Sequence, residues 1–245
     1  MSRVLGALLA LTLLPSTALA AAQGGWSCSS GEQQAALVEL YTSQGCSSCP
    51  PADRWLSAAK QREDLWTAVV PVAWHVTYWD YIGWRDPFGD RSNDRRQREM
   101  ARDARAQVYT PGMFLNRGEF RRWYRLPPGA AENAPRSVGT LAAMEEEGIV
   151  TVVFTPAPGV ALRKPRLELV YLRSGQHTAV KAGENHGREL TNDFVAGKIH
   201  RAELSKDGQS WQATLSAAPT ADSNAVALWI TERDGTLVQA TGGWL

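Results

Sequence analysis

One short stretch constrains the fold most, because an apolar run, a turn, two cysteines and a helical pattern follow one another in it. Residues 36–41 (ALVELY) are mostly apolar and predict a buried strand, and residues 42–45 predict a turn. Beyond the cysteines, four apolar residues recur at the i, i+3, i+4 and i+7 spacing of a helix packed on a sheet: Ala52, Trp55, Leu56 and Ala59. The sequence therefore places Cys46 and Cys49 where a strand passes into a helix N-terminus.

This position favours thiol chemistry over a purely structural bond. A disulfide that closes a four-residue loop stabilises by only about 2 kcal/mol in the loop-entropy model, against about 4.7 kcal/mol for a loop of roughly 100 residues. The free N–H groups and the dipole of a helix start favour a thiolate, and a shift of about 1.5 pKa units would leave Cys46 roughly half ionised at neutral pH. Ser47 and Ser48 can add hydroxyl donors.

Two prolines, Pro50 and Pro51, directly follow the second cysteine. Proline is tolerated in the first turn of a helix, but a second one reaches toward the first intrahelical hydrogen bond. We therefore expect an irregular or kinked start to this helix.

The first twenty residues predict a secretory signal. Arg3 precedes an apolar run over residues 4–14, and Ala18 and Ala20 form a small-x-small cleavage site, so residues 1–20 are expected to be removed. The alternative is an uncleaved N-terminal anchor. We expect a periplasmic or secreted protein with no stable membrane anchor after cleavage, and in such a compartment a CxxC pair implies redox exchange, metal capture or a small staple.

The net charge of the chain does not indicate a nucleic-acid partner. Loss of Arg3 leaves 25 of the 26 basic residues against 25 acidic ones, so the formal charge of the cleaved chain is zero. Residues 91–125 nevertheless hold ten arginines. They are interpreted either as a solvated helical face with internal ion pairs or as a docking surface for an acidic partner.

A metal site is the main alternative to redox chemistry. Residues 67–74 predict a second buried strand, and His75 follows at its C-terminal end. Two thiolates and an imidazole from Cys46, Cys49 and His75 would suit Cu(I) or Zn. Otherwise His75 is a hydrogen-bonded structural residue.

Further segments leave alternatives open. The aromatic residues 78–88 either cover the core or line a substrate groove, and residues 92–107 predict a helix at the surface. Cys28 is unpaired by count, so it can bond to Cys46 or Cys49, link two chains, or stay free.

The domain pattern changes after about residue 125. Residues 127–130 predict a linker, residues 134–148 a helix, and residues 149–245 a series of short strands typical of a small antiparallel β-sandwich. The loop at residues 183–188 either joins two of these strands or folds back toward Cys46. The expected organisation is a signal peptide (1–20), an N-terminal segment (21–35), a first domain (36–148) and a β-sandwich (149–245).

Four separated motifs, VELYTSQGCSSCPPAD, HVTYWDYIGWRDPF, VYTP and GENHGREL, resemble a family of exported bacterial thioredoxin-like proteins catalogued as domain of unknown function 1223. The resemblance implies an α/β fold, with a thioredoxin-like domain that carries an inserted aromatic and helical segment, followed by the β-sandwich. It also implies that Cys46 attacks a disulfide, that Cys49 resolves the mixed disulfide, and that Thr110 precedes a cis Pro111 where substrate binds.

These implications lead to an expected activity. The protein is expected to be a thiol–disulfide oxidoreductase that acts on protein or small-molecule disulfides or thiols, needs no cofactor, and is reset by an unidentified redox partner. Ser47 and Ser48 replace the Gly-Pro or Pro-His usual between such cysteines, so the direction of electron flow stays open. The alternatives are a Cu(I)/Zn-binding or metal-delivery protein and a redox-inert binding module.

Overall fold

The computed structural model describes residues 25–128 and 136–245. The expected signal peptide and part of the expected linker lie outside these residues. Within them, no helix has the length and apolar character needed to cross a membrane.

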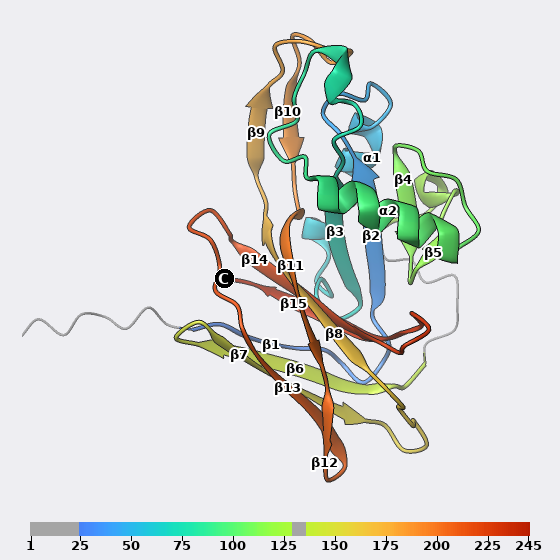
Figure 1. Cartoon of the computed structure of the whole chain (residues 1–245), viewed down its shortest axis with the longest axis vertical. Coiled ribbons are helices and arrows are strands. Elements are labelled where there is room, and N and C mark those ends of the chain that lie inside the picture. The colour runs from blue at the N-terminus through green and yellow to red at the C-terminus, as the bar shows by residue number, and fades with distance from the viewer. Residues whose placement is uncertain (1–24, 129–135) are drawn as a thin grey trace, which may run out of the picture.

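An eight-stranded sheet forms the centre of the molecule (Figure 1). Its order is β15-β14-β8-β11-β3-β2-β4-β5, and only the β2–β3 and β3–β11 pairs are parallel. The strands are β2 (Ala36–Thr42), β3 (Val69–His75), β4 (Gly112–Leu115), β5 (Gly118–Glu119), β8 (Arg166–Arg173), β11 (Val195–Glu203), β14 (Ala225–Thr231) and β15 (Leu237–Trp244). Strands from both halves of the chain therefore share one sheet.

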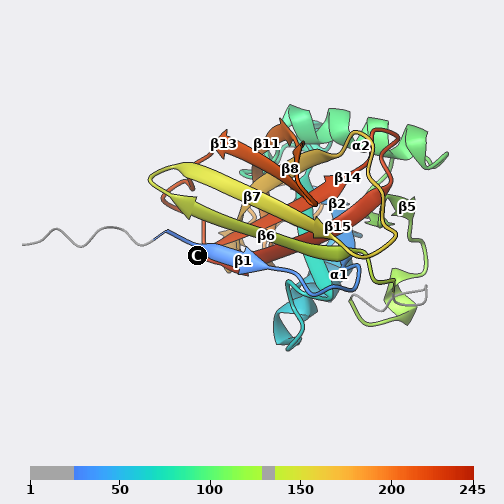
Figure 2. The ribbon, with the colours of Figure 1, turned by 90° about the horizontal axis from the view of Figure 1, so that it is seen from below.

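Two smaller sheets complete the β structure. A five-stranded antiparallel sheet has the order β1-β6-β7-β13-β12 and covers one side of the β8–β14–β15 region (Figure 2). Its strands are β1 (Ser27–Ser29), β6 (Gly139–Glu146), β7 (Ile149–Pro156), β12 (Ser205–Asp207) and β13 (Ser210–Ser216). The third sheet is a hairpin of β9 (Gln176–Ala179) and β10 (Glu189–Asn192), which stands beside α1.

The two α-helices of the described residues lie on opposite faces of the β2–β3 end of the large sheet (Figures 1 and 2). They are α1 (Pro50–Ser57) and α2 (Arg91–Asp103), and short 3-10 turns occur at η1 (Ala58–Gln61), η2 (Asp80–Ile82) and η3 (Trp123–Arg125). The expected irregular start of α1 is not observed. The helix begins at Pro50, with Pro50 and Pro51 in its first two positions, and it loses regularity only at its other end, where η1 follows.

Strand β14 shows how the large sheet separates two cores. All seven of its residues are buried, although a strand with one wet face would alternate. Ala225, Ala227 and Trp229 pack into the core shared with β2 and β3. Val226, Leu228 and Ile230 pack into the core shared with the five-stranded sheet. The sheet is therefore the middle layer and is buried on both sides here.

The prediction of an α/β thioredoxin-like fold was wrong. The described residues are mostly β, with 43% in strands and 14% in helices, and they form several sheets and two α-helices. The two buried strands predicted at residues 36–41 and 67–74 are present as β2 and β3. Their sequences did not predict that β11 lies directly beside β3, with Val195 opposite Ala73. Pairing between residues more than a hundred positions apart leaves no local signal in the sequence.

Two element predictions also need correction. Residues 134–148 were expected to form a helix, but the described part contains β6, whose residues alternate between buried and exposed as in a half-buried strand. The helix predicted over residues 92–107 is present as α2, yet it is not merely a surface helix, because Asn93, Arg96 and Gln97 are buried.

Candidate functional site

Cys46 and Cys49 are joined by a disulfide at the start of α1, with their Cα atoms 5.5 Å apart. Cys49 is the residue that immediately precedes the first helical turn. Both cysteines are buried, whereas Ser47 and Ser48 between them are exposed. The Ser48 hydroxyl lies 3.3 Å from the Cys46 sulfur, within hydrogen-bonding range. The predicted strand-to-helix placement of the pair is therefore confirmed.

The turn before Cys46 is held by hydrogen bonds to Gln44. The backbone N–H of Gln44 donates to Asp86 (2.8 Å), and its side-chain amide donates to Asn192 (2.8 Å). The indole of Trp84 donates to the side-chain oxygen of Gln44 (3.2 Å). Gln44 is buried, and its hydrogen bonds reach two separate parts of the chain, the segment of Trp84 and Asp86 and the base of the β9–β10 hairpin. Such a satisfied buried network fixes the loop conformation that carries the disulfide.

Residues 183–188, here called the hairpin tip, connect β9 to β10 and reach the disulfide. The buried side chain of Asn185 donates to the carbonyls of both Gln44 and Cys46, each at 2.9 Å. The carboxylate of Glu184 accepts a hydrogen bond from the backbone N–H of Ser47 at 2.9 Å. Both interpretations of this loop are therefore confirmed, because it joins two strands of a hairpin and also folds back toward Cys46.

The Thr110–Pro111 segment lies beside the same loop, and its peptide bond is cis as expected. The indole of Trp79 donates to the Thr110 hydroxyl at 2.7 Å. Trp79 also packs on the residue before Cys46, since a Cβ placed at Gly45 would lie 3.0 Å from the Cβ of Trp79. Trp79, from the aromatic segment, therefore connects Thr110 to the residue before Cys46.

A buried histidine–carboxylate pair lies beneath the loop. His75 Nδ1 is 2.7 Å from Asp86, and both side chains are fully enclosed. Burial alone would lower the pKa of His75, but the Asp86 carboxylate outweighs it, so the pKa of His75 is raised. His75 Nε2 is buried without a hydrogen-bond partner.

Asp53 adds a second buried carboxyl to this region. It lies in α1, one turn after Cys49, and burial raises its pKa to about 6. The charge of His75 opposes this rise, which indicates that the two side chains are close enough to interact. The pKa values of Asp53 and His75 are therefore both raised in their buried surroundings.

The alternative metal site is not assembled. Among the residues that the structure describes, no group of three or more His, Cys, Asp or Glu side chains could hold a metal ion. Cys46 and Cys49 are bonded to each other, and His75 is engaged with Asp86.

Cys28 belongs to a different part of the fold. It lies on β1, opposite Ala143 of β6, and its thiol is free. Burial raises the pKa of this thiol to about 12. Of the three alternatives for Cys28, a bond to Cys46 or Cys49 is not observed.

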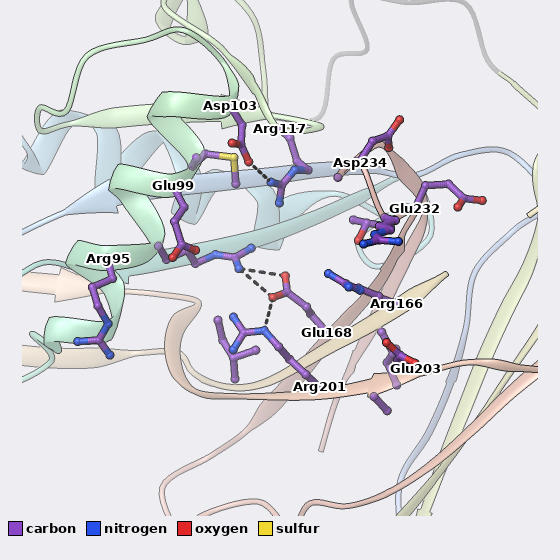
Figure 3. Close-up of a pocket in the computed structure, with 18 of the residues that line it drawn as sticks. Arg95, Glu99, Asp103, Arg117, Arg166, Glu168, Arg201, Glu203, Glu232 and Asp234 are labelled. Carbon is purple, nitrogen blue, oxygen red and sulfur yellow. Dashed lines mark hydrogen bonds and ion pairs between the residues drawn. The ribbon is translucent and has the colours of Figure 1, made fainter. Parts of the chain in front are cut away.

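A cavity of about 910 Å³ is lined by α2, β8, β11 and the turn before β15, and none of the residues of the disulfide loop lines it (Figure 3). Charged side chains line it, and its central groups are paired. Arg96 contacts Glu39 (2.6 Å) and Glu168 (2.9 Å), and Glu168 also accepts from Arg201 (2.8 Å). The guanidinium of Arg96 also lies over the rings of Trp74 and Trp229. This arrangement joins α2 to the sheet.

Sequence reasoning missed four residues of the site, namely Gln44, Asp53, Asp86 and Asn192. Asp53 had a usable signal, because it lies four positions after Cys49 on an expected helix and so belongs to the same helical face. The other three had none, because their partners come from distant loops.

Residues 37–231 match the family described as Protein of unknown function (DUF1223). The crystal structure of protein AGR_C_4864 from Agrobacterium tumefaciens superposes with a TM-score of 0.63 and 24% identity, covering 87% of this chain and 94% of that chain. HBP35 of Porphyromonas gingivalis superposes with a TM-score of 0.56 and 10% identity, covering 88% of this chain and 76% of that chain.

At these identities the two structures show likeness of fold alone. No curated protein matches the chain. The thioredoxin-like superfamily suggested by the motifs is not confirmed by these matches. The family match spans most of the sequence and includes both cysteines, the Thr110–Pro111 segment and the hairpin tip. The chain therefore belongs to the DUF1223 family.

Proposed function

We propose that the protein is a thiol–disulfide oxidoreductase whose active pair is Cys46 and Cys49. The observation that carries this proposal is the disulfide itself, at a helix N-terminus and in a turn held by buried hydrogen bonds. The bond closes only four residues, so its entropic contribution to stability is small, about 2 kcal/mol. Neither cysteine belongs to the two hydrophobic cores of the described residues.

The reaction needs only the two cysteines and a substrate thiol or disulfide. A substrate thiolate attacks the Cys46 sulfur, a mixed disulfide forms, and Cys49 leaves as a thiolate that takes up a proton. A second substrate thiolate then displaces Cys46, so the protein gains two electrons and the substrate is oxidised to a disulfide. Run in reverse, the same steps reduce a substrate disulfide.

Thr110 and Pro111 are proposed to contact the substrate, since they lie near the disulfide loop through Trp79. Only 1% of Cys46 is exposed. Attack therefore requires the exposed Ser47–Ser48 turn or the hairpin tip to move outward. A periplasmic or secreted location and a separate redox partner are part of this proposal, supported by the signal-like residues 1–20.

The test is to trap the mixed disulfide. A Cys49→Ser variant should accumulate covalent complexes through Cys46 when incubated with exported proteins of its host, and these complexes should dissolve on reduction. The matched Cys46→Ser variant should form far fewer, because its remaining thiol is the resolving one. If Cys49→Ser forms no adducts and the wild-type protein neither reduces nor oxidises a test disulfide, the proposal is wrong.

A further inference from the structure

The hairpin tip brings a carboxylate to the disulfide from a part of the chain 137 residues away. Glu184 accepts the backbone N–H of Ser47, the residue next to Cys46. A second hydrogen bond lies beside this one, because the next residue of the hairpin tip, Asn185, donates to the carbonyl of Cys46. Gly183 is seated on Trp84, where an added Cβ would lie 3.2 Å from the Trp84 Cβ.

The base of the hairpin is anchored as well. Asn192 bonds to Gln44 (2.8 Å), and Asp193 forms an ion pair with Lys60 (2.7 Å), which follows α1. The hairpin is therefore tied to the disulfide region at its tip and at its base, and the position of Glu184 is defined by these contacts.

We propose that Glu184 is a positioning residue of the redox site, whose carboxylate holds the Ser47 amide and opposes formation of the Cys46 thiolate after the disulfide is reduced. This inference rests on the proposed thiol–disulfide function. Its physical basis is that a negative charge near a thiol disfavours the ionised form of that thiol.

The charge on Glu184 is present at neutral pH and lacks an ion-pair partner. Its contacts with Ser47 lower the pKa of the Glu184 carboxyl. Within the described residues, no lysine or arginine forms an ion pair with Glu184. Other charged or titratable groups around the site include Asp53 and Arg54 in α1, His75 and Asp86 beside β3, and His186 and Arg188 in the hairpin tip.

The pairing of these surrounding groups leaves the negative charge of Glu184 free to act on the Cys46 thiol. His75 and Asp86 are paired with each other, and Arg188 donates to the side-chain oxygen of Asn185 at 3.1 Å. Glu184 thus opposes the helix N-terminus, which favours the Cys46 thiolate. Because Glu184 is exposed, solvent and salt weaken its charge, and we expect its removal to change the thiolate fraction by roughly two- to fivefold.

The experiment measures the alkylation of Cys46 by iodoacetamide in the fully reduced, full-length protein, from pH 5 to 9, with peptide mass spectrometry to follow Cys46 alone. Glu184→Gln keeps an oxygen for the Ser47 N–H but removes the charge. Glu184→Ala removes both. Glu189→Gln is the matched control, because Glu189 is exposed on β10 and its register partner is Ala179, away from the disulfide loop.

We expect Glu184→Gln to shift the midpoint of the alkylation profile to lower pH, with a roughly two- to fivefold faster rate on the acidic side and an unchanged plateau. The shift should shrink at 1 M NaCl, and Glu189→Gln should match wild type. If only Glu184→Ala changes the plateau rate of alkylation, the lost hydrogen bond to Ser47 has altered the access of iodoacetamide to Cys46, which supports the positioning role. The same midpoint in wild type and Glu184→Gln, or an equal shift in Glu189→Gln, would overturn the inference.

This test is separable from the proposed function. Alkylation of a reduced thiol needs no disulfide substrate, so the midpoint can shift in a protein that exchanges no disulfides. Conversely, a protein that exchanges disulfides normally, with the same midpoint in wild type and Glu184→Gln, would keep the proposed function and lose the role of Glu184.

Discussion

The side-chain amide of Asn185 donates a hydrogen bond of 2.9 Å to the backbone carbonyl of Cys46, from 139 residues away in the sequence. The same amide group also donates to the carbonyl of Gln44. One buried side chain therefore supplies two carbonyls of the turn that carries the disulfide, and it connects this turn to the hairpin inserted between β8 and β11.

Replacement of Asn185 by alanine is expected to destabilise the protein by roughly 1–3 kcal/mol. The buried carbonyl of Gln44 loses the donor that Asn185 supplies, and the carbonyl of Cys46 keeps only the backbone N–H of Cys49. Chemical denaturation of the oxidised protein measures the change. The control is His186→Ala, an exposed neighbour in the same tip, which should stay within about 0.5 kcal/mol of wild type. Equal stability of Asn185→Ala and wild type would mean that water replaces the amide in both bonds.

Local patterns in the sequence predicted the elements around the cysteines. The run of residues 36–41 corresponds to β2, the run of residues 67–74 overlaps β3, and the expected helix start at the cysteines corresponds to α1. These succeed because each element buries one continuous apolar segment or stripe, which the sequence displays directly. The arrangement of the strands was not predictable in the same way.

The central sheet illustrates why. Strands β8 and β14 are apolar on both faces because a second sheet covers one face and the β2–β3 core covers the other. Such continuous apolar runs are equally compatible with a separate sandwich, which was the prediction. Which strand lies next to β3 depends on tertiary packing and not on the periodicity of either strand.

The site was predictable to a similar extent. The CxxC spacing and Thr110-Pro111 could be identified from motifs, and in the fold Trp79 contacts both Thr110 and the residue before Cys46. Asp86 and Asn192 could not, because a single polar residue in a loop has no pattern that identifies its partner. Their roles follow from buried contacts, the hydrogen bonds of Gln44 to both residues and the pairing of Asp86 with His75.

Arg96 is expected to be essential for stability. Its guanidinium pairs with the buried carboxylate of Glu39 and with Glu168, so Arg96→Met would leave a buried charge without its partner. Breaking a buried ion pair in this way costs about 3–5 kcal/mol. Denaturant unfolding compares this variant with Arg98→Met, a change at an exposed position of the same helix. If both variants unfold at the same midpoint, the ion pairs of Arg96 contribute little.

Cys28 is expected to be chemically inert in the folded protein. With its pKa raised to about 12, only about 0.01% of the thiol is ionised at pH 8. Iodoacetamide should therefore label Cys28 at least roughly 100-fold more slowly in the native protein than in guanidinium chloride, as followed by intact mass. Cys28→Ala should leave the rate of disulfide exchange unchanged. Fast native labelling would show that β1 opens readily or that the thiol is less enclosed than in the structure.

Asp53 is expected to make stability depend on pH. Its carboxyl has a pKa of about 6 in the folded protein and an ordinary value of 3.8. Between these two pH values the folded state keeps a proton on Asp53 that the unfolded chain has lost. The free energy of unfolding therefore falls as pH rises through this range, and the full decrease is reached above about pH 6. The shift corresponds to at most about 3 kcal/mol.

Asp53→Asn should therefore be as stable as wild type near pH 4 and more stable by up to about 3 kcal/mol at pH 7, as measured by unfolding of the oxidised protein across this range. Asp64→Asn is the control, because the pH dependence of the stability that Asp64 contributes has the opposite sign to that of Asp53. The Arg62 guanidinium lowers the pKa of Asp64, so the stability that Asp64 adds is lost as pH falls. A pH profile of Asp53→Asn parallel to that of wild type would mean that Asp53 ionises in the folded protein as it does in the unfolded chain.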